Sequence, residues 1–144
     1  MAQLKNTRSA SGRRRRGLAL IELALVLPLL LWITFGVMEY GWMFLKASQI
    51  ANAARQGARV GARPDANATL VNTAITGAMT AAGISSGAYS GGVTLTPADP
   101  TTLASGAQFT VKIQVPYASI GLGLPLIPTP TKLTSQVTMA REGP

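Results

Sequence analysis

One stretch of sequence decides the fold, Arg13-Arg-Arg-Arg16-Gly17-Leu18-Ala-Leu-Ile21-Glu22, together with the apolar run that continues from it to Met38. The arginines end at a glycine, and about twenty apolar residues follow, enough for a helix rising ~1.5 Å per residue to cross a bilayer core of ~30 Å. Glu22 is the one charged residue between Leu18 and Met38. A charge inside such a run costs at least ~2.5–3.5 kcal/mol, so Glu22 requires a specific explanation.

The positive charge of the chain is concentrated before this run. The formal net charge is +8, and six of the thirteen basic residues lie before Gly17, where no acidic residue occurs. A basic segment beside a membrane span sets topology, so we expect residues 1–16 to be a disordered cytoplasmic leader, with the rest of the chain across the membrane. The leader residues that we expect to set this orientation are Arg13, Arg14, Arg15 and Arg16. We do not expect a nucleic-acid partner.

Helical character continues beyond the apolar run, because no proline occurs between Glu39 and Arg63. The predicted helix therefore covers residues 18–63, with a membrane span at 18–38 and an extended part at 39–63, and Pro64 ends it. Pro28 is expected to kink it. Small residues at heptad spacing predict a seam for close packing, formed by Ala47, Ala51, Ala54, Ala58 and Gly61.

Two further features mark this helix. Aromatic residues fall at or past the far end of the span, as in an interfacial belt, at positions Trp32, Tyr40, Trp42 and Phe44. Three arginines, Arg55, Arg59 and Arg63, recur at i+4 steps on another face. A solvated basic face and a partner surface explain them equally well.

Residues 64–144 predict a small outer domain of the α+β class. Asp65 or Asn67 is expected to cap a second helix over 68–82, with Leu70, Ala74, Ala78 and Ala81 lining one face. A loop at 83–92 leads to strands at 93–96, 109–115 and 132–139, where apolar and polar residues alternate. We expect the long helix to pack on the resulting small antiparallel sheet. The apolar loop at 120–130 either lies against this domain, which we favour, or forms an exposed patch.

The sequence contains no constellation of catalytic residues. It has no cysteine and no histidine, which removes thiolate metal sites and the commonest general base. The acids beyond the helix, Asp65, Asp99 and Glu142, are isolated. We therefore expect a non-enzyme without cofactor, metal or small-molecule substrate.

Glu22 needs a cation within the membrane. Cleavage after Gly17 would create one, the α-amino group of Leu18, one helical turn from Glu22. That amine is reached more easily from an adjacent, axially shifted helix than from the same helix. A buried ammonium–carboxylate pair would then fix the register between subunits.

This pattern resembles the class III signal of type IV pilins, and more specifically the TadE-like pseudopilins of tight-adherence (Tad/Flp) pilus systems. The residues that carry the resemblance are Arg-Arg-Gly17, Ile21-Glu22-Leu-Ala-Leu-Val-Leu-Pro28, Phe35-Gly36-Val-Met-Glu39-Tyr40 and Asn52-Ala-Ala-Arg55-Gln-Gly57-Ala-Arg59. The resemblance implies a leader at 1–17, cleaved by a prepilin peptidase between Gly17 and Leu18, with Glu22 as the assembly carboxylate.

It further implies a minor pilin in the bacterial inner membrane, with a cytoplasmic N-terminus and an outer domain at 64–144. Its implied partners are the prepilin peptidase, other pilin subunits and the assembly platform, and its implied role is in the adherence pilus. The principal Flp pilins are much shorter, which favours an accessory subunit. The alternative is an uncleaved, single-pass membrane-anchored binding module.

Overall fold

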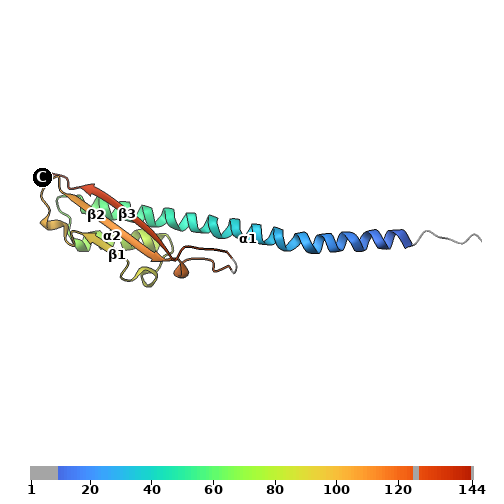
Figure 1. Ribbon diagram of the computed structural model, residues 1–144. Helices are drawn as coiled ribbons and strands as arrows, with labels where there is room; N and C mark the ends of the chain where they lie inside the picture. The colour runs from blue at the N-terminus through green and yellow to red at the C-terminus, as the bar shows by residue number, and fades with distance from the viewer. Residues whose placement is uncertain (1–9, 125–126, 144) are drawn as a thin grey trace, which may run out of the picture. The chain divides into compact units, whose positions relative to one another are not determined.

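The computed structural model describes residues 10–124 and 127–143, with side chains described from Gly17 onward. The chain divides into two compact units, Met1–Met38 and Glu39–Pro144. The element order, with a first helix α1 running through both units, is shown in Figure 1. The α+β prediction, a long N-terminal helix with a small antiparallel sheet, is confirmed.

Helix α1 spans Ala10–Gly61, 52 residues. It begins earlier than expected: the leader was predicted to be disordered, but its residues 10–16 are helical. The helical part of the leader includes Arg13, Arg14, Arg15 and Arg16. Arginine is a good helix former, so an apolar helix can extend backwards into an arginine run at little cost. The leader's residues 1–9 lie outside the described part of the chain.

At its other end, α1 stops just before the predicted end at Arg63. Ala62 N–H still donates a hydrogen bond to Ala58 O at 3.0 Å, and Arg63 N–H donates to Val60 O at 3.2 Å. The last turn therefore tightens before Pro64, which has no N–H to continue the helix.

Helix α2 spans Ala68–Ala81, close to the predicted range. The side chain of Asn67 caps it, with Oδ1 accepting a hydrogen bond from Leu70 N–H at 2.9 Å. Gly83 ends it in the left-handed region, with φ of 68°, a conformation that glycine adopts without steric cost.

The buried face of α2 differs from the face that the sequence pattern indicated. Leu70 and Ala81 are exposed and Ala74 and Ala78 are half-buried, whereas the buried residues are Val71, Ile75 and Met79. These three recur every four residues and are larger than alanine, so turning this face inward removes more apolar surface from water. The loop predicted at 83–92 contains a short 3₁₀ helix, η1, at Ser86–Tyr89, whose Tyr89 is buried.

The sheet contains three antiparallel strands in the order β1-β2-β3. Strand β1 covers Val93–Thr96, β2 covers Gln108–Pro116 and β3 covers Lys132–Ala140, so the three strand predictions are confirmed. Two more 3₁₀ helices follow β1 and β2, η2 at Pro100–Thr102 and η3 at Tyr117–Ser119. Alternation gives the central strand one apolar face, on which every second residue from Phe109 to Val115 is buried.

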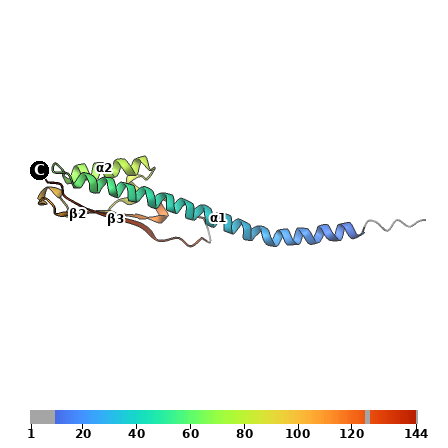
Figure 2. The same ribbon diagram turned by 90° about the horizontal axis from the view of Figure 1, so that it is seen from above.

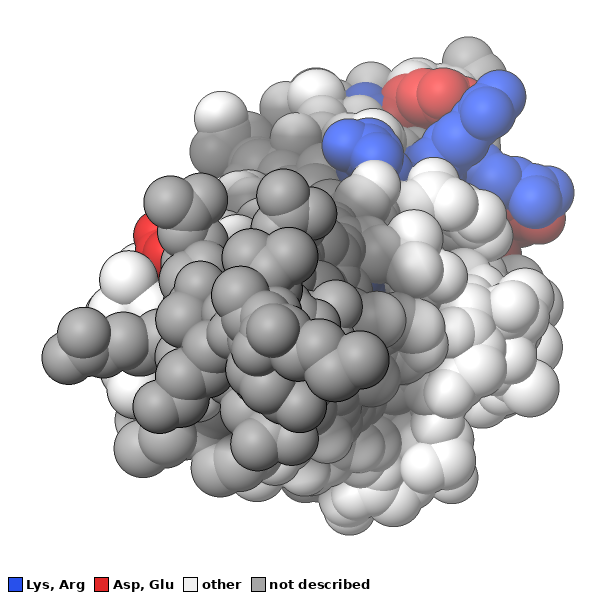
Figure 3. Space-filling view, turned by 90° about the vertical axis from the view of Figure 1, so that its right-hand side faces the viewer, with Lys and Arg blue, Asp and Glu red and all other residues white. Residues whose placement is uncertain are grey.

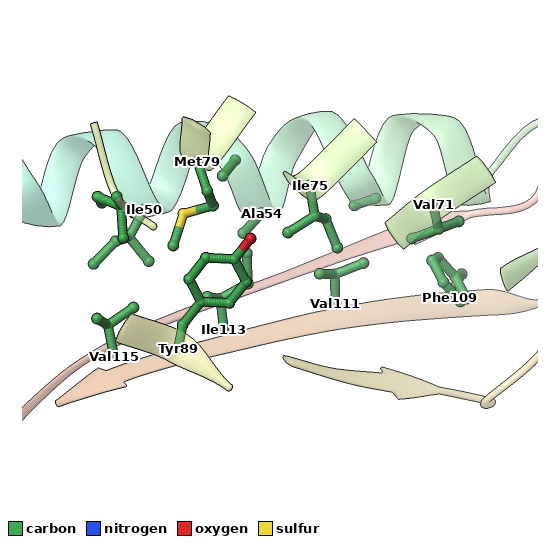
Figure 4. Close-up of a cluster of buried hydrophobic side chains, with 13 residues drawn as sticks. Ile50, Ala54, Val71, Ile75, Met79, Tyr89, Phe109, Val111, Ile113 and Val115 are labelled. Atoms are coloured by element: carbon green, nitrogen blue, oxygen red, sulfur yellow. The ribbon is translucent and has the colours of Figure 1, made fainter. Parts of the chain in front are cut away.

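The core of the second unit lies between this face and the two helices (Figures 2 and 4). Figure 4 shows side chains from the helices pointing toward those of β2. The cluster contains Ile50, Ala53, Ala54 and Ala58 from α1, Val71, Ile75 and Met79 from α2, Ile84 and Tyr89 from the connection, and Phe109, Val111, Ile113 and Val115 from β2.

Candidate functional site on the N-terminal helix

The first unit contains an apolar helix whose described residues are largely exposed. From Gly17 to Met38 each residue is exposed except Gly36, which is half-buried. Within the described residues, α1 is the one helix long and apolar enough to cross a membrane. Its most apolar window of 18 residues has a mean hydropathy of 2.4, and none of that window is buried. Such a surface needs lipid or other apolar helices around it.

The residues of the predicted cleavage and assembly site lie on this helix. Gly17 and Leu18 are exposed, and Leu18 is 70% exposed. Glu22 is exposed as well, in a shallow hollow with Ala19, and takes part in no hydrogen bond or ion pair among the described residues. The structure thus leaves the Glu22 carboxylate open to a partner outside this chain.

The four leader arginines are placed by their backbone alone. The chain is helical at each of them, but their side chains lie outside the described part of the structure. The orienting role predicted for this group therefore stays a prediction, and it concerns Arg13, Arg14, Arg15 and Arg16. The kink predicted at Pro28 also stays a prediction: Pro28 lies inside α1, and the helix is continuous through it.

The predicted packing seam lies on the side of α1 that faces the core. Ala54, Ala58 and Gly61 are buried, and Ala47 and Ala51 are half-buried. The buried stripe is wider than the seam, because it also contains Ile50, Ala53, Gly57 and Ala62.

Two glycines of this stripe, Gly57 and Gly61, allow α2 and β2 to approach α1 closely. A Cβ at Gly61 would lie 2.0 Å from Phe109 Cε1, and one at Gly57 would lie 2.5 Å from Ile75 Cγ1. Glycine at these two positions therefore lets β2 and α2 touch the backbone of α1.

The predicted basic face of α1, Arg55, Arg59 and Arg63, is exposed. Arg63 pairs with Asp65 at 2.8 Å across the surface, a contact worth ~0–1 kcal/mol. Arg55 and Arg59 have no ion pair among the described residues. In Figure 3 most of the charged side chains in view gather at the upper right, and much of the remaining described surface is uncharged.

Glu39 is the residue that the sequence reasoning missed. It is 0% exposed, although it directly follows the apolar run. Its Oε1 accepts a hydrogen bond from Tyr117 Oη at 2.6 Å, and its Oε2 accepts a longer one from Leu124 N–H at 3.4 Å. No basic side chain pairs with it among the described residues. A buried carboxylate needs such donors, because an unpaired buried charge is costly.

The contact also changes the acidity of the phenol. Burial, the hydrogen bond to Glu39 and the negative charge of Glu39 together raise the pKa of Tyr117 from 10.0 to about 12. Each effect disfavours the phenolate, so Tyr117 remains a donor to Glu39 across the physiological pH range.

Two more residues of the same turn of α1 bind the loop between β2 and β3, residues 117–131. Tyr40 Oη donates to Pro128 O at 3.0 Å, and Trp42 Nε1 donates to Ile120 O at 2.6 Å. In Figures 1 and 2 the described parts of this β2–β3 loop, 117–124 and 127–131, lie beside α1. The prediction that it is buried against the domain holds in part, because Ile120, Leu124 and Ile127 are half-buried but Leu122 is 43% exposed.

A half-open cavity of about 440 Å³ lies between Glu39 and this loop. Its other lining residues are Tyr117, Ala118, Gly121, Gly123, Leu124, Thr129, Pro130 and Thr131. The lining offers one carboxylate and one phenol but no nucleophile paired with a base. No group of three or more His, Cys, Asp or Glu side chains that could hold a metal lies in the part of the chain that the structure describes.

Lys46 links α1 to the C-terminal end of α2. It is 7% exposed, and its Nζ donates to Ala82 O at 2.9 Å, at the C-terminal end of α2. The ammonium also lies 4.9 Å from the centre of the Trp42 ring. A cation at a helix C-terminus and over an indole is favourable in both respects.

The comparison with protein families agrees with these features. No curated protein and no solved structure matches the chain. Residues 17–59 match the family of TadE-like proteins. The match begins at the predicted cleavage residue and ends four residues before the predicted end of the helix. It confirms the resemblance found in the sequence, and it identifies residues 17–59 as a TadE-like segment.

Proposed function

We propose that this protein is a minor pilin, or pseudopilin, of a Tad/Flp-type pilus. A prepilin peptidase cleaves it after Gly17, and the mature chain then enters the adherence pilus or initiates its assembly. The observation that carries this proposal is the TadE-like match over 17–59, which covers the cleavage site and the helix together. The proposed role is structural rather than enzymatic.

The exposed apolar helix supports this role. From Leu18 to Met38 each residue except Gly36 is exposed, so this segment requires an apolar environment before and after processing. The bilayer provides it for the precursor, and the helices of neighbouring subunits provide it in a filament. By the positive-inside rule, the arginines at 13–16 place the N-terminus in the cytoplasm.

The position of Gly17 inside α1 also fits proteolysis. The Gly17–Leu18 peptide bond is helical, so a peptidase must unwind it locally. A glycine inside a helix lowers the helix stability by ~0.5–1 kcal/mol relative to alanine, which makes unwinding easier at this bond.

The proposed processing is tested by a pair of leader variants. Gly17→Val should remain full length when it is expressed with the prepilin peptidase, because the bulky side chain replaces the residue at the cleaved bond. Gly12→Val is the matched control and should be processed. Intact mass distinguishes the two forms. Equal processing of both variants would count against Gly17 as the cleavage residue.

The proposed role of Glu22 is to pair with the new α-amino group of Leu18 on a neighbouring subunit. Glu22→Ala should therefore be cleaved normally but be depleted from sheared pili. Val26→Ala, an apolar change one turn along the same exposed helix, should be cleaved and incorporated. Normal incorporation of Glu22→Ala would refute the pairing. Retention of residues 1–17 in the mature protein would favour the alternative, an uncleaved membrane-anchored binding module.

A further inference from the structure

The β2–β3 loop has a composition unlike the rest of the outer domain. In the sequence no charged residue occurs between Lys112 and Lys132. Among its described residues, 117–124 and 127–131, Leu122 and Gly123 are exposed, as are Pro128 and Thr129. The exposed side chains of this loop are apolar, small or hydroxyl-bearing, as at Ser119, Thr129 and Thr131, and none of them is charged.

Three residues of α1 hold this loop, and they lie within one helical turn. Glu39 accepts from Tyr117 at 2.6 Å, Tyr40 donates to the backbone of the loop at 3.0 Å, and Trp42 does so at 2.6 Å. The loop is therefore fixed at one level along α1.

That level is the end of the predicted membrane span. Residues 39–42 directly follow Met38 in the same helix, so at ~1.5 Å per residue they lie within ~6 Å of the last residue of the span. The headgroup region extends ~5–8 Å beyond the hydrocarbon core on each side. Tyrosine and tryptophan, which anchor the loop, are the residue types that gather in this region.

The surface of α1 remains apolar over the next turn. Phe44 is 69% exposed and Leu45 is 47% exposed. Like Leu122 in the loop, they belong to the unit formed by Glu39–Pro144 and leave apolar area open to the surroundings.

We propose that the described parts of this loop, 120–124 and 127–131, form a second membrane-contacting element that rests in the headgroup region of the outer leaflet. Glu39, Tyr40 and Trp42 position it there. The occupant of the surface is phospholipid, because the loop is uncharged and is held where α1 leaves the bilayer. The inference rests on the membrane-spanning part of the proposed function. It gives the precursor two contacts with the membrane, one of which must be released when the subunit moves into a filament.

The chain has no cysteine, so single cysteines can carry a nitroxide label at chosen positions. Leu122→Cys reports on the loop and Leu29→Cys on the predicted span. Ser105→Cys, exposed in the turn before β2, is the aqueous control. The full-length protein is reconstituted into phosphatidylcholine vesicles at one copy per vesicle or fewer. Relaxation by oxygen, which concentrates in lipid, is compared with relaxation by a water-soluble nickel chelate.

We expect the ratio of oxygen to nickel relaxation to be severalfold higher at Leu122→Cys than at Ser105→Cys, and highest at Leu29→Cys. A low ratio at position 122 with a high ratio at position 29 would overturn the loop inference alone. Protection of position 122 from both reagents would also overturn it, since the loop would then be covered by protein. A low ratio at position 29 would instead refute the membrane span, and the proposed function with it.

A second variant tests the positioning residues. The double substitution Tyr40→Phe and Trp42→Phe removes both hydrogen bonds to the loop but keeps an aromatic ring at each position. We expect the ratio at Leu122→Cys to fall in this background and the ratio at Leu29→Cys to be unchanged. An unchanged ratio at position 122 would overturn the assignment of Tyr40 and Trp42 as anchors.

Discussion

Replacing Gly61 with alanine would push a methyl group into the ring of Phe109. The new Cβ would lie 2.0 Å from Cε1 and 2.3 Å from Cδ1 of that ring. Carbon atoms in contact lie ~3.5–4.0 Å apart, so the ring and the helix must separate by more than an ångström. Phe109 is 0% exposed, and its rigid ring has no flexible end that can swing away.

The expected loss of stability follows from two opposing effects. Overpacking of a filled core costs ~1–3 kcal/mol, and occasionally more. Alanine gains up to ~1 kcal/mol over glycine in a helix interior, but Gly61 is the last residue of α1, so the gain there is smaller. We expect Gly61→Ala to lower the free energy of unfolding of the outer domain by ~1–3 kcal/mol.

Gly77→Ala is the matched control. A Cβ at Gly77 meets nothing within 4 Å, and this glycine lies on the exposed side of α2. There the same substitution should stabilise the domain by ~0.4–1 kcal/mol. Denaturant unfolding of the detergent-solubilised chain, followed by near-ultraviolet circular dichroism, measures both changes as shifts of the midpoint at constant slope. If Gly61→Ala were as stable as Gly77→Ala, α1 would not pack against β2 as described.

Three further predictions concern the outer domain. The pKa of Tyr117 is raised to about 12, so between pH 10 and 12 the folded state keeps a proton that the unfolded state has lost. The free energy of unfolding should therefore fall as the pH rises through that window. In a tyrosinate absorbance titration, Tyr117→Phe should abolish the late step. Asn67→Ala should cost ~1 kcal/mol through loss of the helix cap, whereas Asn72→Ala on the exposed face of α2 should be neutral or better by denaturant unfolding. In the same assay Val71→Ala should destabilise the domain by at least ~1 kcal/mol, and Leu70→Ala by less than ~0.5 kcal/mol. The reverse order would mean that Leu70, and not Val71, packs in the core.

Local patterns were sufficient for most of the fold. The strands at 93–96, 108–116 and 132–140 follow from strict alternation. A capping residue marks the start of α2, and of the two candidates, Asp65 and Asn67, the structure shows Asn67 in this role. These features depend on residues close together in the chain.

The errors arose where distant residues decide the outcome. On α2, a stripe of alanines and a stripe of larger residues compete for the core, and the shape of the opposite sheet decides between them. Glu39 gains its role from Tyr117, which is 78 residues away in the sequence. The sequence did contain a signal that Glu39 has a special role, because this carboxylate lies at the end of an apolar run and Tyr40 follows it directly. It did not identify the partner, because no local pattern links the helix to the β2–β3 loop.

The central claim is that Gly17 divides a disposable leader from the mature helix. Intact-mass and N-terminal sequence analysis of the protein from membranes and from sheared filaments tests it most directly. We predict a mature chain that begins at Leu18, shorter by residues 1–17. A mature chain that begins at Met1 or Ala2 in both fractions would contradict this claim.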